Sequence, residues 1–179
     1  MIMNIFYVDH NPVVAAQCLV DRHVVKMVLE SAQLLSTAHR VIDGIKIQGK
    51  SSTGRNQKQW IIGDYRDRVL YKATHINHPS AVWCRQSIEN YEWLVEHFFA
   101  LTDEYTFRYK KIHKCFTKIG DALINHPSNM KTKNWTPIPS CMDDEYIISD
   151  DPVENYRNYY KFGKDYLHSW KNRQPPDWI

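Results

Sequence analysis

The sequence has few cysteines, few glycines and no long hydrophobic run. Its 4 cysteines, Cys18, Cys84, Cys115 and Cys141, stand far apart in the 179-residue chain and form no Cys-x-x-Cys pair. This spacing matches neither a zinc site nor a disulfide framework, so we expect reduced thiols and no bound metal. No apolar run approaches the roughly 20 residues that cross a bilayer, and residues 1–9 have no basic start of the kind that signal peptides carry. The sequence therefore predicts a soluble, cytoplasmic protein without membrane contact.

The chain also lacks a strong excess of one charge. Its 23 Lys and Arg against 20 Asp and Glu give a formal net charge of +3, which is too small to indicate a polyanionic partner by itself. The distribution is uneven, because seven basic residues between positions 44 and 73 stand against Asp64 and Asp67. The seven are Lys46, Lys50, Arg55, Lys58, Arg66, Arg68 and Lys72. A Gly- and Ser-rich basic segment suits phosphate contacts to nucleic acid, although a solvated loop has the same composition.

Hydrophobic periodicity predicts a mostly α fold in one domain, residues 1–179. Helices are expected over 12–42, 80–109, 110–124 and 151–171, with Asn11 and Pro12 starting the first. We expect a compact bundle of three to four helices around a central N-terminal helix, with at most a short strand at residues 4–8. The basic segment 44–78 is predicted as a loop, and residues 125–150 as irregular structure.

One stripe of polar side chains interrupts the otherwise apolar first helix. At about 100° per residue, seven polar positions fall within roughly a third of its circumference. They are Arg22, His23, Lys26, Glu30, Gln33, Thr37 and Arg40. A helix with so much apolar surface is usually buried, and buried ionisable groups must be paired, hydrogen-bonded or in a wet cleft. Glu30 between His23 and Lys26 fits this description, but an exposed i,i+4 pair of Lys26 and Glu30 is the alternative.

Two histidines precede the second long helix. His75 and His78 are three residues apart, a spacing that could serve a metal, but no carboxylate lies close in sequence. Asn and His residues before Pro79 commonly cap and orient a helix, so we expect that role first. Both histidines also remain candidate contacts to nucleic acid.

Two further segments carry a family resemblance. Leu19-Val20-Asp21-Arg22-His23, followed seven residues after His23 by Glu30, resembles the phage pyrimidine dimer DNA glycosylase/AP lyase family, whose first long helix carries Asp-x-His and a catalytic Glu at this spacing. The segment 156–164, with Tyr159-Tyr160 and Gly163-Lys164, is similar to the closing Tyr-Tyr-Gly-Lys segment of that family. The chain as a whole is also similar to small tailed-phage proteins of unassigned function.

The resemblance implies a mostly helical enzyme that binds ultraviolet-damaged duplex DNA, kinks it and extrudes a base. An N-terminal amine would attack the sugar carbon to form a Schiff base. Glu30 would then act as the acid/base, and His23 as a substrate or phosphate contact. Where the family flanks its Glu with arginines, this chain has Leu29 and Gln33. Lys26, one turn before Glu30, is an alternative nucleophile if it loses its proton.

The leading hypothesis is a DNA-binding enzyme that acts on a damaged or modified base or an abasic site, within an infected host cell if the protein is viral. Its catalytic residues would be Glu30, His23 and Lys26, its partner double-stranded DNA, and neither a cofactor nor a metal is expected. The expected DNA contacts are Arg22, Gln33, Arg40, Lys46, Lys50, Arg55, Lys58, Arg66, Arg68, Lys72, His75 and His78. The sequence leaves the oligomeric state open.

Two other function classes fit the same features. One is a non-enzymatic phage protein that binds nucleic acid or a host factor, with the polar stripe as a structural ion-pair ladder. The other is a small enzyme that processes free nucleotides, in which the basic loop holds a phosphate. For the second, Gly49-Lys50-Ser51-Ser52 is only a partial phosphate-binding loop, because the earlier glycine of that motif is missing.

Overall fold

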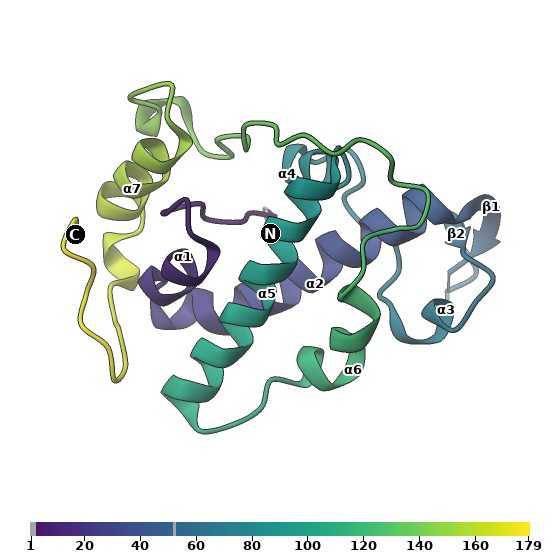
Figure 1. Ribbon diagram of the computed structural model, residues 1–179, viewed down its shortest axis with the longest axis horizontal. Helices are drawn as coiled ribbons and strands as arrows, with labels where there is room; N and C mark the ends of the chain where they lie inside the picture. Colours follow the sequence, from purple (N-terminus) through teal and green to yellow (C-terminus); the bar gives the residue numbers. More distant parts are fainter. Residues whose placement is uncertain (1–2, 52) are drawn as a thin grey trace.

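The computed structural model describes residues 3–51 and 53–179, and this part of the chain contains seven α-helices and one two-stranded sheet (Figure 1). The helices are α1 (Pro12–Cys18), α2 (Asp21–Asp43), α3 (Arg66–Val69), α4 (Pro79–Cys84), α5 (Ile88–Tyr109), α6 (Lys114–Leu123) and α7 (Pro152–Gly163). The strands are β1 (Ile45–Lys50) and β2 (Asn56–Ile61), and two 3-10 turns span Asp144–Tyr146 and Asp165–Leu167. The prediction of a mostly α fold is confirmed. None of the described helices is both long and apolar enough to cross a bilayer.

The predicted first and second helices are each broken in two, so the helices outnumber the expected three to four. Asn11 caps α1, since its side chain accepts hydrogen bonds from the N–H groups of Val13 and Val14. Leu19 and Val20 are then extended, and both are completely buried, so packing holds the bend before α2. The second break separates α4 from α5, and the Ser87 side chain caps α5. A serine cap of this kind satisfies an otherwise unpaired N–H and starts a new helix.

The segment predicted as a loop over 44–78 contains a β-hairpin and α3. Strands β1 and β2 pair antiparallel, with Ile45 opposite Ile61 and Lys50 opposite Asn56. Gly54 lies in the connection with a φ of 78°, a conformation that glycine adopts without steric cost. Residues 4–8, predicted as at most a short strand, form no strand and belong to an arm with a turn at Phe6, where φ is 57°. The sheet follows the C-terminal end of α2, away from the N-terminal residues (Figure 1).

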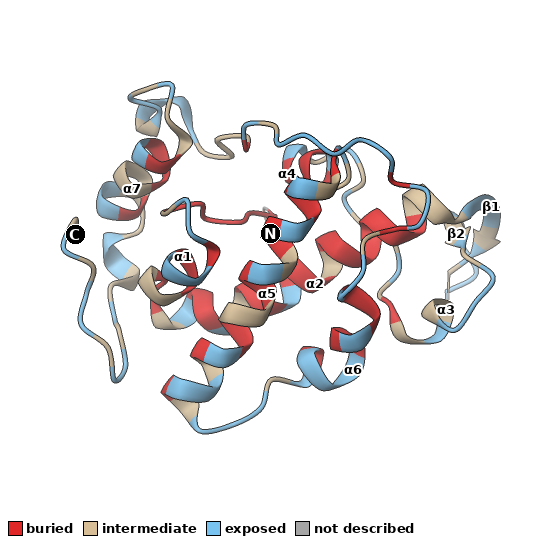
Figure 2. Ribbon diagram, in the orientation of Figure 1, coloured by how far each residue is buried: buried red, intermediate tan, exposed pale blue. Residues whose placement is uncertain are grey.

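The N-terminal arm, residues Met3–Val8, is buried along its whole length (Figure 2). Polar contacts tie it to distant segments. Asn4 Nδ2 donates to the Cys141 carbonyl at 2.9 Å, and the Tyr156 hydroxyl donates to Asn4 Oδ1 at 2.9 Å. Arg157 Nε donates to the Val8 carbonyl at 2.8 Å. The arm is thus held against α7 and the irregular segment that precedes it.

The core lies where α2 crosses α5, with α1 on α5 and with α4 and α6 on α2. The α2 side chains buried there include Val24, Met27, Val28, Leu34 and Leu35, and those of α5 include Leu94, Phe98 and Leu101. Burial of each such side chain contributes about 1.5–3 kcal/mol. The central N-terminal helix of the prediction corresponds to α2, which passes through the middle of the molecule (Figure 2).

A buried ionic cluster fixes the start of α2. Arg108, on α5, has a completely buried side chain that donates to Glu104 at 2.6 Å, to Asp21 at 3.0 Å and to the Gln17 carbonyl at 3.0 Å. Arg173 adds two bonds of 2.6 Å to Glu104. The cluster joins α2, α5 and the C-terminal tail, so the first turn of α2 has a defined position.

Candidate functional site

A pocket of about 790 Å³ opens beside the first turns of α2. Arg22, His23 and Lys26 line it from α2, and Asn4 and Phe6 line it from the N-terminal arm. Further lining residues include His78, Cys141, Tyr159, Lys164 and Tyr166. Both ends of the chain therefore contribute to one concave site, which is large enough for a nucleotide-sized ligand.

Glu30 lies behind this pocket and is 2% exposed. Its Oε2 accepts a hydrogen bond from the backbone N–H of Asn4 at 3.0 Å. Its Oε1 lies 2.9 Å from Lys26 Nζ, and the Lys26 side chain is 40% exposed. The alternative of an exposed Lys26–Glu30 pair is therefore wrong, because the Glu30 carboxylate is buried and only the Lys26 ammonium reaches the pocket.

His23 is held as a neutral imidazole. Its Nδ1 lies 2.6 Å from the hydroxyl of Tyr160, whose oxygen accepts a hydrogen bond from the Val20 N–H at 3.4 Å. Burial lowers the pKa of His23 to about 3, and three nearby cations act in the same direction. With the Tyr160 proton directed to Nδ1, the neutral ring carries its own proton on Nε2. His23 can then donate one hydrogen bond to a bound group.

The ring of Phe6 packs against the imidazole of His23. The two rings are stacked, with centroids 4.2 Å apart and an interplanar angle of 17°. Phe6 has a φ of 57°, which is strained for a bulky side chain. The side chain of Asn4 supports this backbone turn, because its Oδ1 accepts from the N–H groups of Ile5 and Phe6. Strain of this kind next to a pocket is a frequent property of functional sites.

The wall that α7 and the following turn contribute is aromatic and cationic. Lys164 Nζ lies 4.6 Å from the centre of the Tyr159 ring and 5.9 Å from that of Tyr166. Burial disfavours the charge of Lys164, but its interactions with the two tyrosines outweigh this effect and raise the pKa of Lys164. Lys164 is therefore a fixed cation at the pocket, suited to an anionic group such as phosphate.

The two histidines predicted before the second helix take different places. His78 lines the pocket and caps α4, since its Nδ1 accepts a hydrogen bond from the Ser80 N–H at 3.2 Å. His75 is exposed, has a φ of 46° and bonds to Thr74 Oγ1 at 2.8 Å. In the described residues, no group of three or more His, Cys, Asp or Glu side chains is arranged to hold a metal ion.

Arg40, predicted as a DNA contact, is 5% exposed and serves the protein itself. Its guanidinium donates to Asp67 Oδ1 at 2.8 Å and to four backbone carbonyls. Those carbonyls belong to Trp60, Asp67, Leu70 and Tyr71. Arg40 thus joins the end of α2 to the base of the hairpin and to α3. Because these bonds occupy its guanidinium, we no longer count Arg40 among the expected DNA contacts.

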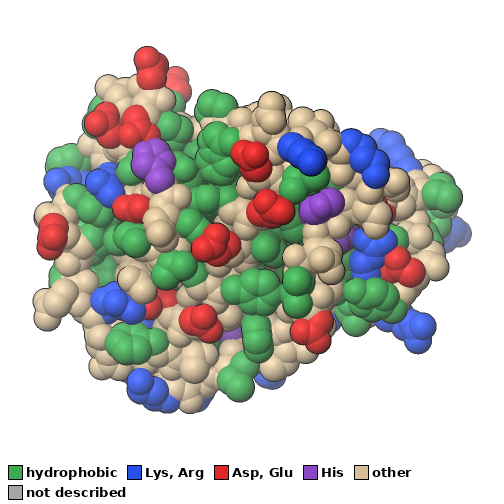
Figure 3. Space-filling view, viewed as in Figure 1, with side chains coloured by type: hydrophobic (Ala, Val, Ile, Leu, Met, Phe, Trp, Pro, Cys, Tyr) green, Lys and Arg blue, Asp and Glu red, His purple; other side chains and the backbone are tan. Residues whose placement is uncertain are grey.

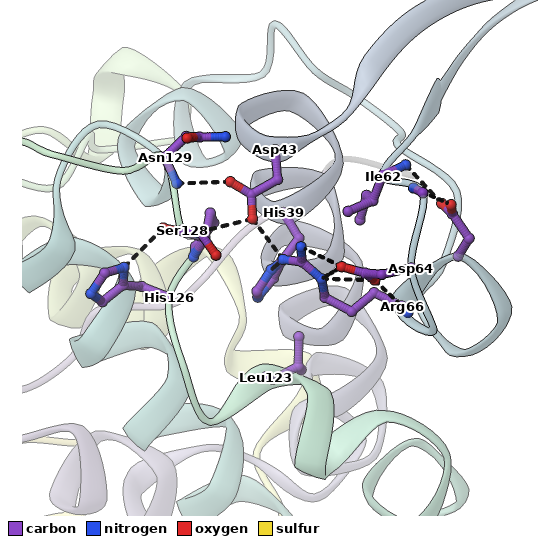
Figure 4. A network of polar contacts seen from close by, with 12 residues as sticks. His39, Asp43, Ile62, Asp64, Arg66, Leu123, His126, Ser128 and Asn129 are labelled. Atoms are coloured by element: carbon purple, nitrogen blue, oxygen red, sulfur yellow. Dashed lines mark hydrogen bonds and ion pairs between the residues drawn. The ribbon is translucent and has the colours of Figure 1, made fainter.

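Arg66 has a similar internal role (Figure 4). It pairs with Asp43 at 2.6 Å and with Asp64 at 2.8 Å, and its Nη1 donates to His39 Nδ1 at 2.9 Å. Burial lowers the pKa of His39 to about 4, so His39 is a neutral acceptor here. Asp43 also accepts from the N–H groups of residues 128 and 129, as Figure 4 shows. The network holds the segment after β2 against α2.

The remaining predicted contacts do not share one place. Arg22 is exposed at the rim of the pocket, and Gln33 is half-buried farther along α2. The exposed basic side chains of the hairpin region are Lys46, Lys50, Arg55, Lys58, Arg68 and Lys72. They lie toward the opposite end of α2 from the pocket.

The sequence analysis did not assign several residues to the site. Asn4, Phe6, Tyr159, Tyr160 and Lys164 all contact the pocket or its histidine. The last three lie in the Tyr-Tyr-Gly-Lys segment that carries the resemblance, and this was a usable signal. For Asn4 and Phe6 the sequence offered none, because an apolar arm is not distinctive.

Comparison with known protein families identifies a family for this chain. The sequence model of a family described as "Pyrimidine dimer DNA glycosylase" matches residues 3–117. This range contains the N-terminal arm, α2 with Glu30, the hairpin and α5. No curated protein and no solved structure matches the chain.

Proposed function

Because the chain belongs to the pyrimidine dimer DNA glycosylase family, we propose that it is an enzyme that acts on a damaged or modified base, or on an abasic site, in double-stranded DNA. One observation supports this most strongly. The two segments that carry the family resemblance meet at the same pocket, where the Tyr160 hydroxyl lies 2.6 Å from His23 Nδ1. The buried carboxylate of Glu30 lies directly behind it, joined to Lys26.

The proposed reaction begins with an amine. Its nitrogen forms a bond to C1′ of the deoxyribose while the bond from C1′ to the base breaks, and the base leaves with a proton. At an abasic site the C1′ hydroxyl leaves as water in place of the base. The bond from C1′ to the ring oxygen O4′ then breaks, O4′ takes up a proton, and the electron pair of the nitrogen forms the C1′=N bond of an iminium ion between the enzyme and the sugar. Loss of the C2′ proton to a carboxylate then allows the bond from C3′ to the phosphate oxygen to break, which cuts the strand.

Two amines are candidates for the nucleophile. The α-amino group belongs to residue 1 and lies outside the described residues. Asn4, however, donates its N–H to Glu30, so the arm enters the site beside this carboxylate. Lys26 is the second candidate. As an ammonium it has no free electron pair, and the Glu30 oxygen 2.9 Å away is positioned to take its proton.

The other pocket residues would bind the substrate. His23 donates from Nε2, and Lys164 and Arg22 provide positive charge for the phosphates that flank the reacting sugar. The rings of Tyr159 and Tyr166 offer surfaces on which an extruded base can stack. The exposed lysines and arginines of the hairpin region would hold the DNA backbone farther away.

The test is a trapping assay with duplex oligonucleotides that are ultraviolet-irradiated, abasic or undamaged. Borohydride reduces an iminium intermediate to a stable link, so the wild-type protein should form a covalent complex with damaged or abasic DNA and cut the strand. Peptide mapping of that complex separates the α-amine from Lys26. In Glu30→Gln we expect turnover to fall by about a hundredfold or more, the typical contribution of a general acid or base.

Glu92→Gln is the matched control, since it removes an exposed carboxylate from α5 and should leave turnover unchanged. Wild-type activity retained in Glu30→Gln would reject the role of Glu30. Salt-dependent DNA binding without trapping or cleavage would favour the non-enzymatic binding protein, and absence of DNA binding with saturable binding of a free nucleotide would favour the nucleotide-processing enzyme.

A further inference from the structure

The β-hairpin has two chemically different faces. Paired residues of an antiparallel ladder point to the same side, and neighbouring residues of one strand point to opposite sides. The observed register therefore puts Lys46, Gln48, Lys50, Asn56, Lys58 and Trp60 on one side, which we name the basic face. The other side carries Ile45, Ile47, Gly49, Gln57, Gln59 and Ile61.

Side-chain contacts agree with this assignment. Lys46 Nζ lies 5.7 Å from the centre of the Trp60 ring on the basic face. On the opposite face, a Cβ at Gly49 would meet the Gln59 side chain at 2.6 Å, and Gln59 Nε2 donates to the Lys50 carbonyl at 3.1 Å. Five of the six residues of the basic face are exposed, Trp60 being half-buried. The face thus offers three cations, two amides and an indole, without a carboxylate.

We propose that the basic face of this hairpin inserts into the major groove of double-stranded DNA about six base pairs from the reacting nucleotide. The proposal rests on the proposed function, because it assumes a DNA substrate. The major groove is about 12 Å wide and accepts a two-stranded β-ribbon, whereas the minor groove, at about 6 Å, is too narrow. The lysines meet the phosphates that line the groove, and the amides of Gln48 and Asn56 face the base edges.

Charge complementarity favours DNA as the occupant. Figure 3 shows Lys and Arg side chains gathered at the end of the molecule where β1 and β2 lie, while Asp and Glu side chains are more frequent toward the other end of this view. The basic surface continues beyond the hairpin, since Lys58 and Trp60 line a cavity of about 420 Å³ together with Lys72 and Thr74. The chain then passes through His75 to His78, which lines the pocket.

The hairpin is held firmly relative to the site. Arg40 donates to the Trp60 carbonyl at 2.9 Å, and Asp67 accepts from the N–H groups of Ile62 and Gly63. These bonds fix the end of β2 to the C-terminal part of α2. Thirteen residues separate Glu30 from the end of α2, which corresponds to about 20 Å of helix. A duplex that runs along α2 would therefore meet the hairpin about six base pairs from the reacting nucleotide, at 3.4 Å per base pair.

The experiment compares the wild-type protein with the triple variant Lys46→Gln, Lys50→Gln, Lys58→Gln on one abasic duplex. Each phosphate contact contributes about 0.9 to the slope of log K against log salt, so the variant should reduce that slope by about 2 to 3. Dimethyl sulfate footprinting reports on guanine N7 in the major groove. Protection about five to seven base pairs from the abasic site should appear with the wild-type protein and disappear with the variant.

A matched control removes three exposed lysines elsewhere, Lys111→Gln, Lys114→Gln and Lys133→Gln. It changes the net charge by the same amount and should keep both the salt slope and the protection. An equal loss in both triple variants would overturn the proposal, because net charge would then explain the effect. An unchanged footprint in the hairpin variant, or protection confined to the minor groove, would also overturn it.

The two proposals fail in distinguishable ways. A wild-type protein that gives the hairpin footprint but no covalent trapping refutes the catalytic proposal and leaves the hairpin contact in place. A wild-type protein that traps and cleaves DNA, with a salt slope equal to that of the hairpin variant, refutes only the hairpin contact. Thermal unfolding of each variant tests whether the fold is intact, which we expect because the substituted side chains are exposed.

Discussion

The hydrogen bond between Tyr160 and His23 allows a quantitative test through Tyr160→Phe. The substitution removes one oxygen atom and keeps the ring. The hydroxyl lies 2.6 Å from His23 Nδ1 and 3.4 Å from the Val20 nitrogen, and both Tyr160 and His23 are buried. In the variant the imidazole nitrogen loses its donor in a place that water does not reach.

A buried polar group left without its partner costs about 1–3 kcal/mol. We therefore expect Tyr160→Phe to lower the free energy of unfolding by about 2 kcal/mol. For a chain of this length that corresponds to a decrease in Tm of about 4–8 °C. Since the bond to Tyr160 also directs the proton of His23 to Nε2, turnover on abasic DNA should fall by about tenfold, equivalent to about 1.4 kcal/mol.

Urea denaturation and single-turnover strand cleavage measure the two effects. Tyr65→Phe is the control, because Tyr65 is 58% exposed, and its loss of a hydroxyl should change the unfolding free energy by less than about 0.5 kcal/mol. A double-mutant cycle with His23→Phe should give a coupling energy of about 1 kcal/mol or more. If Tyr160→Phe is as stable and as active as Tyr65→Phe, the reasoning about the His23 tautomer is wrong.

Two further predictions concern stability. Burial lowers the pKa of His23 to about 3 and the pKa values of His39 and His97 to about 4. Between about pH 6.5 and pH 4 the unfolded chain therefore binds protons at these histidines that the folded protein does not bind. As the pH falls through this range, each histidine lowers the free energy of unfolding by about 1.4 kcal/mol per pH unit. Urea midpoints that stay constant from about pH 7 to pH 5 would contradict this prediction. Arg40→Lys keeps the charge but cannot replace the five bonds of the guanidinium, so we expect a loss of about 3 kcal/mol by urea denaturation. A loss below about 1 kcal/mol would contradict the structural role assigned to the bonds between the guanidinium and the backbone carbonyls.

The helical part of the fold could be predicted because its periodicity is strong. The polar stripe of α2 identified Glu30 and His23 as unusual, and both are buried at the back and wall of a pocket. The breaks at Leu19–Val20 and at Ser87 escaped prediction for different reasons. Leu19 and Val20 carry no local signal for a helix break, and the chain bends there because both side chains are packed in the core. Ser87 is a recognisable helix cap, but the apolar periodicity around it predicted one continuous helix.

The hairpin was missed although its sequence alternates. Ile45, Ile47 and Ile61 are 74%, 42% and 41% exposed, so the alternation does not separate a core face from a solvent face. Strand prediction depends on that separation, and the basic, Gly-rich composition pointed to a loop instead. The internal roles of Arg40 and Arg66 could not be predicted from the sequence, because the contacts that join them to other elements span 20 to 31 residues.

The pocket depends on contacts between chain segments that are synthesised at very different times. Its histidine bonds to a tyrosine 137 residues later, and Asn4 bonds to a tyrosine 152 residues later. Such distant contacts form slowly, since the intervening chain must close a large loop before they stabilise anything. During translation α2 and α5 can pack while the wall made by α7 is still inside the ribosome. A nascent chain can therefore form its core well before its pocket is complete, and a product truncated before Tyr160 would lack the hydroxyl that bonds to the imidazole of His23.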